Sequence, residues 1–206
     1  MSGDFPRRLH LGSGKNFLPD WLNVDCSPQW QPDVLHDLEQ PFPSDRSVPY
    51  RTDRFGDVLV GSNTFDEIRA DDLLEHIRAL PTLMTSCLDV LRPAGVFRIS
   101  VPYELSLGAW SDPTHVRAFN ERSWVYWCEW SWYFGWAEFR FHLEDLRFTP
   151  SELGRDHLEA GTPLEEVLRM PRAVDSMQAT LVKVPLTEAD LEALRQHSAR
   201  SRPGPA

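Results

Sequence analysis

Residues 9–15 read LHLGSGK, and an acidic residue, Asp25, follows ten residues later at the end of a second short apolar stretch, residues 21–24. The first stretch alternates apolar side chains and then turns through Gly12 and Gly14, which is typical of a buried strand that runs into a tight loop. Glycines in such a loop allow the backbone to approach a ligand closely, because no Cβ is in the way. We therefore predict two neighbouring strands joined by a glycine loop, with a carboxylate at the end of the second.

The loop composition narrows the choice of ligand. A carboxylate at a strand end beside a glycine loop suits the two hydroxyls of a ribose. The dinucleotide fingerprint needs a third glycine where this chain has Phe17, and a phosphate-cradling loop needs Ser or Thr where it has Asn16. A nucleoside cofactor without phosphate, S-adenosylmethionine, fits better. The alternative is a purely structural turn between two strands.

Length and charge set limits on the class of protein. The chain has 206 residues and a net charge of −10, which corresponds to one domain and argues against a phosphate-backbone partner such as bulk DNA. Residues 1–10 have no apolar signal region and no long apolar run follows, so we expect a cytoplasmic protein without a membrane span. The cysteines Cys26, Cys87 and Cys128 have no metal-binding or CxxC spacing, and we expect reduced thiols.

The remaining pattern predicts an α/β sheet with mainly parallel pairing. Residues 44–64 are loop-like, and residues 58–60 are a candidate arm of a hairpin. Ligands of parallel sheets bind beyond the carboxyl ends of the strands, so polar residues there are site candidates. The predicted elements are strands over 33–38, 65–70, 96–101, 137–148 and 177–184, with helices over 80–91 and 187–196.

Two acids follow the strand predicted at 65–70. Asp72 and Glu75 have the spacing of a helix capping box, and both Asp71 and Asp72 suit a helix start for electrostatic reasons. The functional alternative is that one of the acids faces the cofactor and that His76 faces the substrate.

Taken in order, the segments LHLGSGK, LNVDC, DL, FDEIRADDLLEHI and LRPAGVFRISVP resemble the successive motifs of class I (Rossmann-like) S-adenosylmethionine-dependent methyltransferases, most closely their short bacterial members. The resemblance covers residues 9–102, and residues 112–119 resemble a D-P-T-H-x-R-x-F stretch of some of these enzymes. It implies a Rossmann-like sheet, mainly parallel, with a C-terminal antiparallel hairpin and helices on both faces. It also implies one methyltransferase domain over residues 1–197, with an aromatic-rich substrate-side insertion at about 103–150 and a flexible tail over 198–206.

The resemblance also assigns residues to the cofactor. The glycines approach its methionine part, the first acid binds its ribose, the next acid and leucine lie beside its adenine, and a later acid lies near its edge. There are two departures from the family pattern: Ala94 stands where glycine is usual, and the interval from Gly14 to Asp25 is short for a full first helix. The implied cofactor-binding residues are Leu11, Gly12, Gly14, Asp25, Asp37, Leu38 and Asp71.

An aromatic-rich segment follows from residue 110 to residue 148. Its aromatic residues are too dense for one helix face, so we expect about half of them in the core and the rest lining a pocket or a subunit contact. A homodimer through this region is one expectation. The predicted substrate-binding residues are His76, Tyr103, Trp124 and Trp127.

An acid, a base and a cation begin this segment. His115 is the candidate general base, because an unperturbed imidazole pKa of ~6.5 suits proton removal near neutrality. Asp112 is expected to orient it, and Arg117 to hold a carboxylate or phosphate of the acceptor. The alternative is a loop joined by its own Asp–Arg pair, with His115 in solvent. A metal held by Asp112, His115 and another acid lacks ligand spacing, so no metal site is predicted.

These features predict transfer of a methyl group from S-adenosylmethionine to a small-molecule acceptor, at oxygen rather than nitrogen, by in-line displacement with His115 as the base. Two rival readings remain open. One is a nicotinamide-dependent oxidoreductase on a similar sheet. The other is a non-catalytic cofactor-binding or protein-interaction module that uses its tryptophans as a contact surface.

Overall fold

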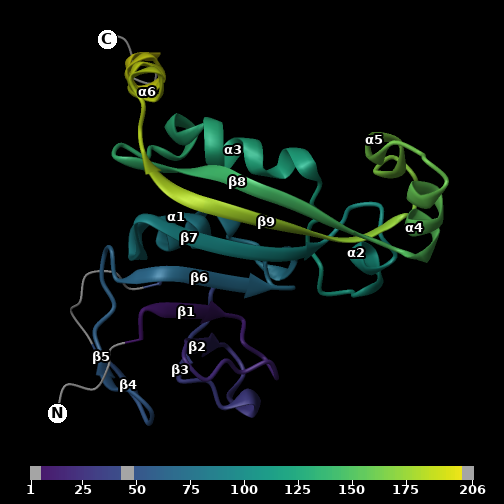
Figure 1. Ribbon diagram of the computed structural model, residues 1–206. Helices are drawn as coiled ribbons and strands as arrows, with labels where there is room; N and C mark the ends of the chain where they lie inside the picture. The colour runs from purple at the N-terminus through teal and green to yellow at the C-terminus, as the bar shows by residue number, and fades with distance from the viewer. Residues whose placement is uncertain (1–5, 43–48, 201–206) are drawn as a thin grey trace.

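The computed structural model describes residues 6–42 and 49–200, without the side chains of residues 198–200. Within these residues, seven strands form one sheet in the spatial order β3-β2-β1-β6-β7-β9-β8. In Figure 1 the strands run across the picture, from β8 at the top to β3 at the bottom. Their bounds are β1 (Arg8–Leu11), β2 (Leu22–Asp25), β3 (Val34–Leu35), β6 (Phe65–Asp71), β7 (Leu91–Pro102), β8 (Phe139–Pro150) and β9 (Val174–Pro185).

The pairing confirms the predicted fold class. Strands β3, β2, β1, β6 and β7 are parallel, whereas β9 is antiparallel to both β7 and β8. The register sets Leu11 opposite Val24 and Ala70. Because parallel strands end at the same edge, this register brings the residues after β1, β2 and β6 together at the carboxyl edge of the sheet.

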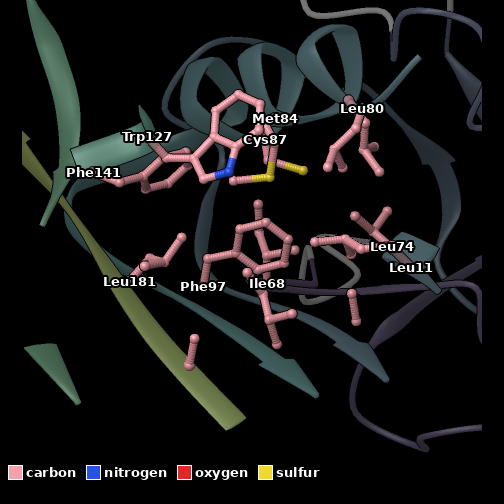
Figure 2. Packing of buried hydrophobic residues seen from close by; sticks show 14 of the residues in the cluster. Leu11, Ile68, Leu74, Leu80, Met84, Cys87, Phe97, Trp127, Phe141 and Leu181 are labelled. Carbon is pink, nitrogen blue, oxygen red and sulfur yellow. The ribbon is translucent and has the colours of Figure 1, made fainter. Parts of the chain in front are cut away.

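Helix α1 (Leu80–Val90) covers one face of the sheet, as its helical spacing predicts. Pro81 lies in its first turn, where the missing N–H is tolerated. Figure 2 shows the side chains of α1 above those of the central strands, where Met84 and Phe97 are fully buried. Burial of large apolar side chains of this kind stabilises a fold by about 2 kcal/mol each, and this face forms the main core.

The opposite face of the central strands is more polar than the face that α1 covers. Strand β6 exposes Arg69 and half-buries Glu67, whereas Ile68 and Ala70 on its other face are buried. Arg98 on β7 is also exposed. In the described residues the connection from β1 to β2 has no helix, and that from β2 to β3 has only the one-turn η1 (Pro28–Trp30). With little helix there to cover it, this face carries charged side chains.

A small hairpin contacts the connection between β1 and β2. Strands β4 (Tyr50–Thr52) and β5 (Gly56–Val58) pair antiparallel, so a hairpin is present, but its second arm shares only Val58 with the predicted arm at 58–60. Between them, Arg54 donates through Nε and Nη2 to both carboxylate oxygens of Asp33, at 2.8 Å each. Arg54 also donates to the backbone carbonyls of Pro19 and Trp21. This arginine fixes the chain just before β2.

The remaining elements follow β7. Helix α6 runs to Arg200, and residues 201–206 of the expected flexible tail lie outside the described residues. None of the helices in the described part of the chain is long and apolar enough to cross a bilayer. The bounds are α2 (Gly108–Ser111), η3 (Glu121–Trp124), α3 (Val125–Glu129), η4 (Ser131–Phe134), α4 (Glu152–Glu159), α5 (Leu164–Val167) and α6 (Glu188–Arg200).

Candidate functional site

The glycine loop folds onto the carboxylate of Asp25. Gly12 and Gly14 both have positive φ, 62° and 46° respectively, a conformation that favours glycine. The N–H of Gly14 donates to Asp25 Oδ2, and the N–H of Ser27 donates to Oδ1, each at 2.8 Å. Asp25 is only 8% exposed. Since a carboxylate oxygen has two lone pairs, each oxygen can accept one further hydrogen bond.

Two residues whose backbones pair with β2 have a buried side-chain atom without a hydrogen-bond partner among the described residues: Ser13 Oγ and His36 Nε2. The backbone N–H of Ser13 donates to the Val24 carbonyl, and that of His36 donates to the Asp25 carbonyl, so both residues lie at the ends of β1 and β3 beside β2. Buried polar groups normally have partners. These two atoms and the free lone pairs of Asp25 fit a ligand that carries hydroxyl and amine groups.

The predicted adenine residues lie at the end of β3. Leu38 is buried, and Asp37 is exposed with its Oδ1 accepting the N–H of Glu39 at 3.0 Å. Leu11 is 1% exposed and its side chain belongs to the core. Asp71 lies 2.5 Å from Arg69 Nε on the charged face of the sheet, where both line a cavity of about 430 Å³.

The chain after β6 does not form the expected helix start. Asp72 adopts a left-handed conformation with φ of 48°, and only the one-turn η2 (Leu74–His76) follows. Its N-cap residue is Leu73, with no side-chain cap. The predicted capping box is therefore wrong, since the α-helix begins later, at Leu80. The side chain of Leu73 instead packs on Gly12, where an added Cβ would lie 2.8 Å from Leu73 Cδ1.

The loop after α2 orients its histidine differently from the prediction. His115 Nδ1 lies 2.9 Å from the carbonyl of Ala109, whereas Asp112 Oδ1 accepts the N–H and the hydroxyl of Thr114, at 2.8 and 2.6 Å. The prediction that Asp112 orients His115 is therefore corrected: Ala109 does so. The Thr114 hydroxyl oxygen lies 2.9 Å from His76 Nδ1, so Asp112 acts on the other histidine.

Three side chains meet where this loop contacts η2, and we name Glu75, His76 and His115 the histidine cluster. The backbone N–H of Val116 donates to the Glu75 carbonyl at 2.8 Å, which joins the two segments. The imidazole ring centres of His76 and His115 are 4.6 Å apart, edge to face, and His115 Nε2 lies 4.0 Å from Glu75 Oε1. The spacing of Glu75 from Asp72 predicted only a cap; the position of Glu75 next to His76 was the available signal for this cluster.

The Glu75 carboxylate is unusual in its surroundings. It is 1% exposed, and neither of its oxygens has a hydrogen-bond partner in the described part of the chain. Burial, together with the nearby Asp72 carboxylate, raises the pKa of Glu75 to about 7. A carboxylate held in this way needs a proton or a cation to compensate its charge.

Arg117 lies beside an aromatic cavity of about 300 Å³. Its Nη2 donates to the Arg78 carbonyl, its Nε is buried without a hydrogen-bond partner, and the described residues contain no Asp112–Arg117 pair. Trp127 lines this cavity and stacks on Phe134, with ring centres 4.5 Å apart.

The two other predicted wall residues belong to the core. Trp124 is 1% exposed and stacks on Phe119. Tyr103 is 2% exposed, and its hydroxyl lies 2.9 Å from Glu121 Oε2. Neither lines the aromatic cavity, whereas Trp127 does, together with Tyr126, Tyr133 and Phe134 of the same aromatic segment.

No protein-family model and no curated protein sequence matches the chain. Solved structures do match. A S-adenosylmethionine-dependent methyltransferase from Archaeoglobus fulgidus superimposes with a TM-score of 0.54, at 15% identity over 88% of this chain and 87% of its own. The cyclase SpnF superimposes with a TM-score of 0.50, at 15% identity over 87% of this chain and 75% of its own.

At this level of identity the likeness concerns the fold, and the cyclase illustrates that one fold serves more than one reaction. Two kinds of observation support the same fold: the strand order with its antiparallel C-terminal pair, and the match to the Archaeoglobus enzyme. The chain has the Rossmann-like fold of class I methyltransferases.

Proposed function

We propose that the chain transfers a methyl group from S-adenosylmethionine to a hydroxyl of a small molecule. The observation that carries this proposal is the contact between Gly12 and Leu73. Leu73 is followed directly by η2, so the contact joins the loop that surrounds Asp25 to the histidine cluster. A cofactor loop and a proton-accepting group thus lie side by side at the carboxyl edge of the sheet, where ligands of such sheets bind.

The residues around Asp25 would hold the cofactor. The remaining lone pairs of Asp25 accept hydrogen bonds from ribose hydroxyls, and Ser13 Oγ and His36 Nε2 offer further polar contacts. Leu38 offers apolar surface at the end of β3. When bound, S-adenosylmethionine supplies an electrophilic methyl group, which bonds to the acceptor oxygen as its bond to sulfur breaks and the electron pair stays on sulfur.

The chain's own contribution is to position the acceptor and remove its proton. The Ala109 carbonyl accepts from Nδ1–H of His115, which leaves the lone pair of the neutral ring on Nε2. Nε2 therefore accepts the proton of an acceptor hydroxyl. Arg117 provides a cation for an anionic group of the acceptor, and the cavity of about 300 Å³ suits a small molecule. Hydroxyl acceptors are favoured over amines because they need such a base.

A calorimetric titration tests the cofactor. We expect S-adenosylmethionine and S-adenosylhomocysteine to bind to the wild-type protein with micromolar affinity, and Asp25→Ala to abolish binding. Asp57→Ala is the matched control, because this exposed carboxylate lies on the β4–β5 hairpin, 3.9 Å from Arg51, and has no proposed role at the cofactor. A folded wild-type protein that binds neither compound would exclude the proposal and favour an interaction module.

Turnover separates an enzyme from a cofactor-binding module. His115→Asn should leave cofactor binding intact and abolish methyl transfer once an acceptor is found, whereas a binding module would lose nothing.

The exposed aromatic residues Tyr126, Trp130 and Tyr133 offer a surface for the proposed homodimer. Sedimentation of the wild-type protein measures that state directly.

A further inference from the structure

The histidine cluster has the composition of a metal site. One ligand atom from each of Glu75, His76 and His115 lies within 4.8 Å of the others. Ligand atoms that lie about 2.0–2.2 Å from one ion are about 3.3 Å from each other. Side-chain rotations that move each ligand atom by about 1 Å would therefore close the site. His76 and Glu75 are adjacent on η2, and His115 comes from a separate loop that is tied to η2 through Val116.

Hydrogen bonds fix both imidazole rings in the manner of metal ligands. Ligating histidines usually donate the second ring N–H to a carbonyl or to a carboxylate. For His115, Nδ1 donates to the Ala109 carbonyl at 2.9 Å. For His76, the partner of Nδ1 is the Thr114 hydroxyl, whose single proton is already donated to Asp112 at 2.6 Å. His76 Nδ1 must therefore be the donor, which leaves Nε2 of both rings with the lone pair.

The carboxylate provides the second, independent observation. Glu75 is 1% exposed, and both of its oxygens lack hydrogen-bond partners in the part of the chain that the structure describes. Two further acids, Asp72 and Asp112, are close enough to act on it electrostatically. A buried, unpaired carboxylate among other acids is costly, and a cation removes this cost.

We propose that Glu75, His76 and His115 bind a divalent transition-metal ion, and that an oxygen of the acceptor completes the coordination of this ion. Two imidazole nitrogens and one carboxylate suit manganese, iron, cobalt or zinc rather than calcium or magnesium, which prefer oxygen ligands. Three protein ligands leave positions open for substrate.

This inference rests on the proposed function and changes one part of it. With an ion bound, Nε2 of His115 is a ligand and no longer accepts the acceptor's proton directly. The ion instead lowers the pKa of the hydroxyl that it binds, and the proton passes to water. The substrate class narrows to small molecules with a metal-binding oxygen at the site of methylation.

The test uses Co²⁺ as the probe, with the full-length protein first freed of metal by dialysis against a chelator. We expect one equivalent of Co²⁺ to bind, with visible absorption bands of a site with nitrogen ligands, and Mg²⁺ at equal concentration to leave it bound. Glu75→Gln, His76→Asn and His115→Asn should each weaken binding by about 100-fold or more, beyond the 10–100-fold typical of outer-shell changes.

The matched control is His142→Asn. His142 Nε2 lies 3.9 Å from Glu144 Oε2, nearly the distance of the His115–Glu75 pair, but these side chains are 54% and 62% exposed. We expect this variant to bind Co²⁺ as the wild type does. Absence of stoichiometric binding to the wild type, equal loss in the control, or displacement by Mg²⁺ would each overturn the proposal. Circular dichroism confirms that each variant is folded.

The same metal-free protein is titrated with S-adenosylmethionine. If the cofactor binds and Co²⁺ does not, the metal site is wrong and the proposed function stands. If Co²⁺ binds and the cofactor does not, the chain holds a metal but the methyl-transfer proposal fails.

Discussion

Two buried carboxylates, those of Asp25 and Glu75, lie at the carboxyl edge of the sheet and differ in their hydrogen bonding. Asp25 is 8% exposed, and each of its oxygens accepts a backbone N–H, from Gly14 and from Ser27. Glu75 is 1% exposed, and neither of its oxygens has a hydrogen-bond partner in the described residues. The first carboxylate organises its own loop, whereas the second is held in place without compensation.

This difference in hydrogen bonding suits the two carboxylates to different ligands. Asp25 is preorganised for a neutral ligand, and Glu75 is preorganised for a cation. A carboxylate that already accepts two N–H groups still offers lone pairs to hydroxyls. A carboxylate without donors is stabilised best by a positive charge placed beside it. The two regions are joined through Leu73, which packs on Gly12 and precedes Glu75 by two positions.

The largest effect on the free energy of unfolding is expected from a substitution at the contact between Gly12 and Leu73. Gly12→Ala places a side chain at φ of 62°, and its Cβ would lie 2.8 Å from Leu73 Cδ1. The left-handed conformation costs about 1–2 kcal/mol and the steric overlap adds to it, so we expect a loss of about 2–3 kcal/mol in the free energy of unfolding. Denaturant titration measures this loss.

Gly14→Ala is the control for Gly12→Ala. It has the same sign of φ, 46°, but its nearest neighbour would be the Gly12 carbonyl oxygen at 4.0 Å. We expect about 1 kcal/mol for the conformation alone. Only Gly12→Ala should also weaken Co²⁺ binding, because it displaces Leu73. Equal effects of the two substitutions on metal binding would show that the regions are not coupled through this contact.

The next effect concerns the glycine-loop region alone. Arg54→Ala removes both hydrogen bonds to Asp33, which is 4% exposed at its side chain, and those to the carbonyls before β2. We expect a loss of about 2 kcal/mol, because a buried carboxylate loses its cation. Arg51→Ala on the same hairpin is the control. Its pair with Asp57 is 3.9 Å long, with side chains 90% and 63% exposed, so we expect almost no change.

The pH dependence of stability gives a second measurement of this ion pair. Although burial opposes ionisation, hydrogen bonds from Arg54 and Asn23 lower the pKa of Asp33 below its usual value. A carboxyl whose pKa is lower in the folded state stabilises the fold above its unfolded pKa of ~3.9, and this stabilisation is lost as pH falls through the folded value. The wild type should therefore lose more stability than Arg54→Ala on acidification below about pH 4. Parallel losses in the two proteins would contradict the role of the pair.

A smaller effect is expected from the outer contact of the histidine cluster. Thr114→Val removes the hydroxyl that accepts from His76 Nδ1 and donates to Asp112, with little change in shape. We expect about a tenfold loss of Co²⁺ affinity, since the ring is no longer held in one tautomer. Cofactor binding at Asp25 should not change, and a loss there would mean that the two regions share more than the Leu73 contact.

The sheet was predictable because its signals are local. Alternating side chains end in glycine at Gly12 and in acids at Asp25 and Asp71, and the helical spacing of residues 80–91 matches α1 closely. The sequence pattern also indicated that one face of the sheet is exposed. Strand β6 reads FDEIRAD, which alternates, whereas a parallel strand covered on both faces reads as continuously apolar. The alternation therefore indicated that one face of β6 is polar.

The histidine cluster was not predictable in the same way, because its determinants are tertiary. His115 is oriented by a backbone carbonyl, that of Ala109, which no residue type announces. The partner of His76 is Thr114, 38 positions away in the chain. Whether a buried carboxylate such as Glu75 lacks donors depends on every segment packed around it. The sequence therefore offered Asp112 as the obvious partner of His115, and the fold assigned Asp112 to Thr114.

The smallest expected effect on the free energy of unfolding comes from Glu75→Met, and its sign distinguishes the two carboxylates. Methionine fills a similar volume without a charge, so the metal-free variant should be more stable than the wild type by about 1 kcal/mol. For a chain of this length, about 1 kcal/mol raises the melting temperature by about 2–4 °C. Asp25→Ala should instead lower the melting temperature, because two N–H groups lose their acceptor.

Metal should invert the order of stability between the wild type and Glu75→Met. An ion at 100 times its dissociation constant stabilises the protein that binds it by about 2.7 kcal/mol. With saturating Co²⁺ the wild type should therefore melt above the variant, whose melting temperature stays unchanged. A variant that is less stable than the wild type without metal would show that Glu75 already stabilises the metal-free fold, through its approach to His115 at 4.0 Å. Both carboxylates would then stabilise the metal-free fold, Asp25 through backbone N–H groups and Glu75 through His115.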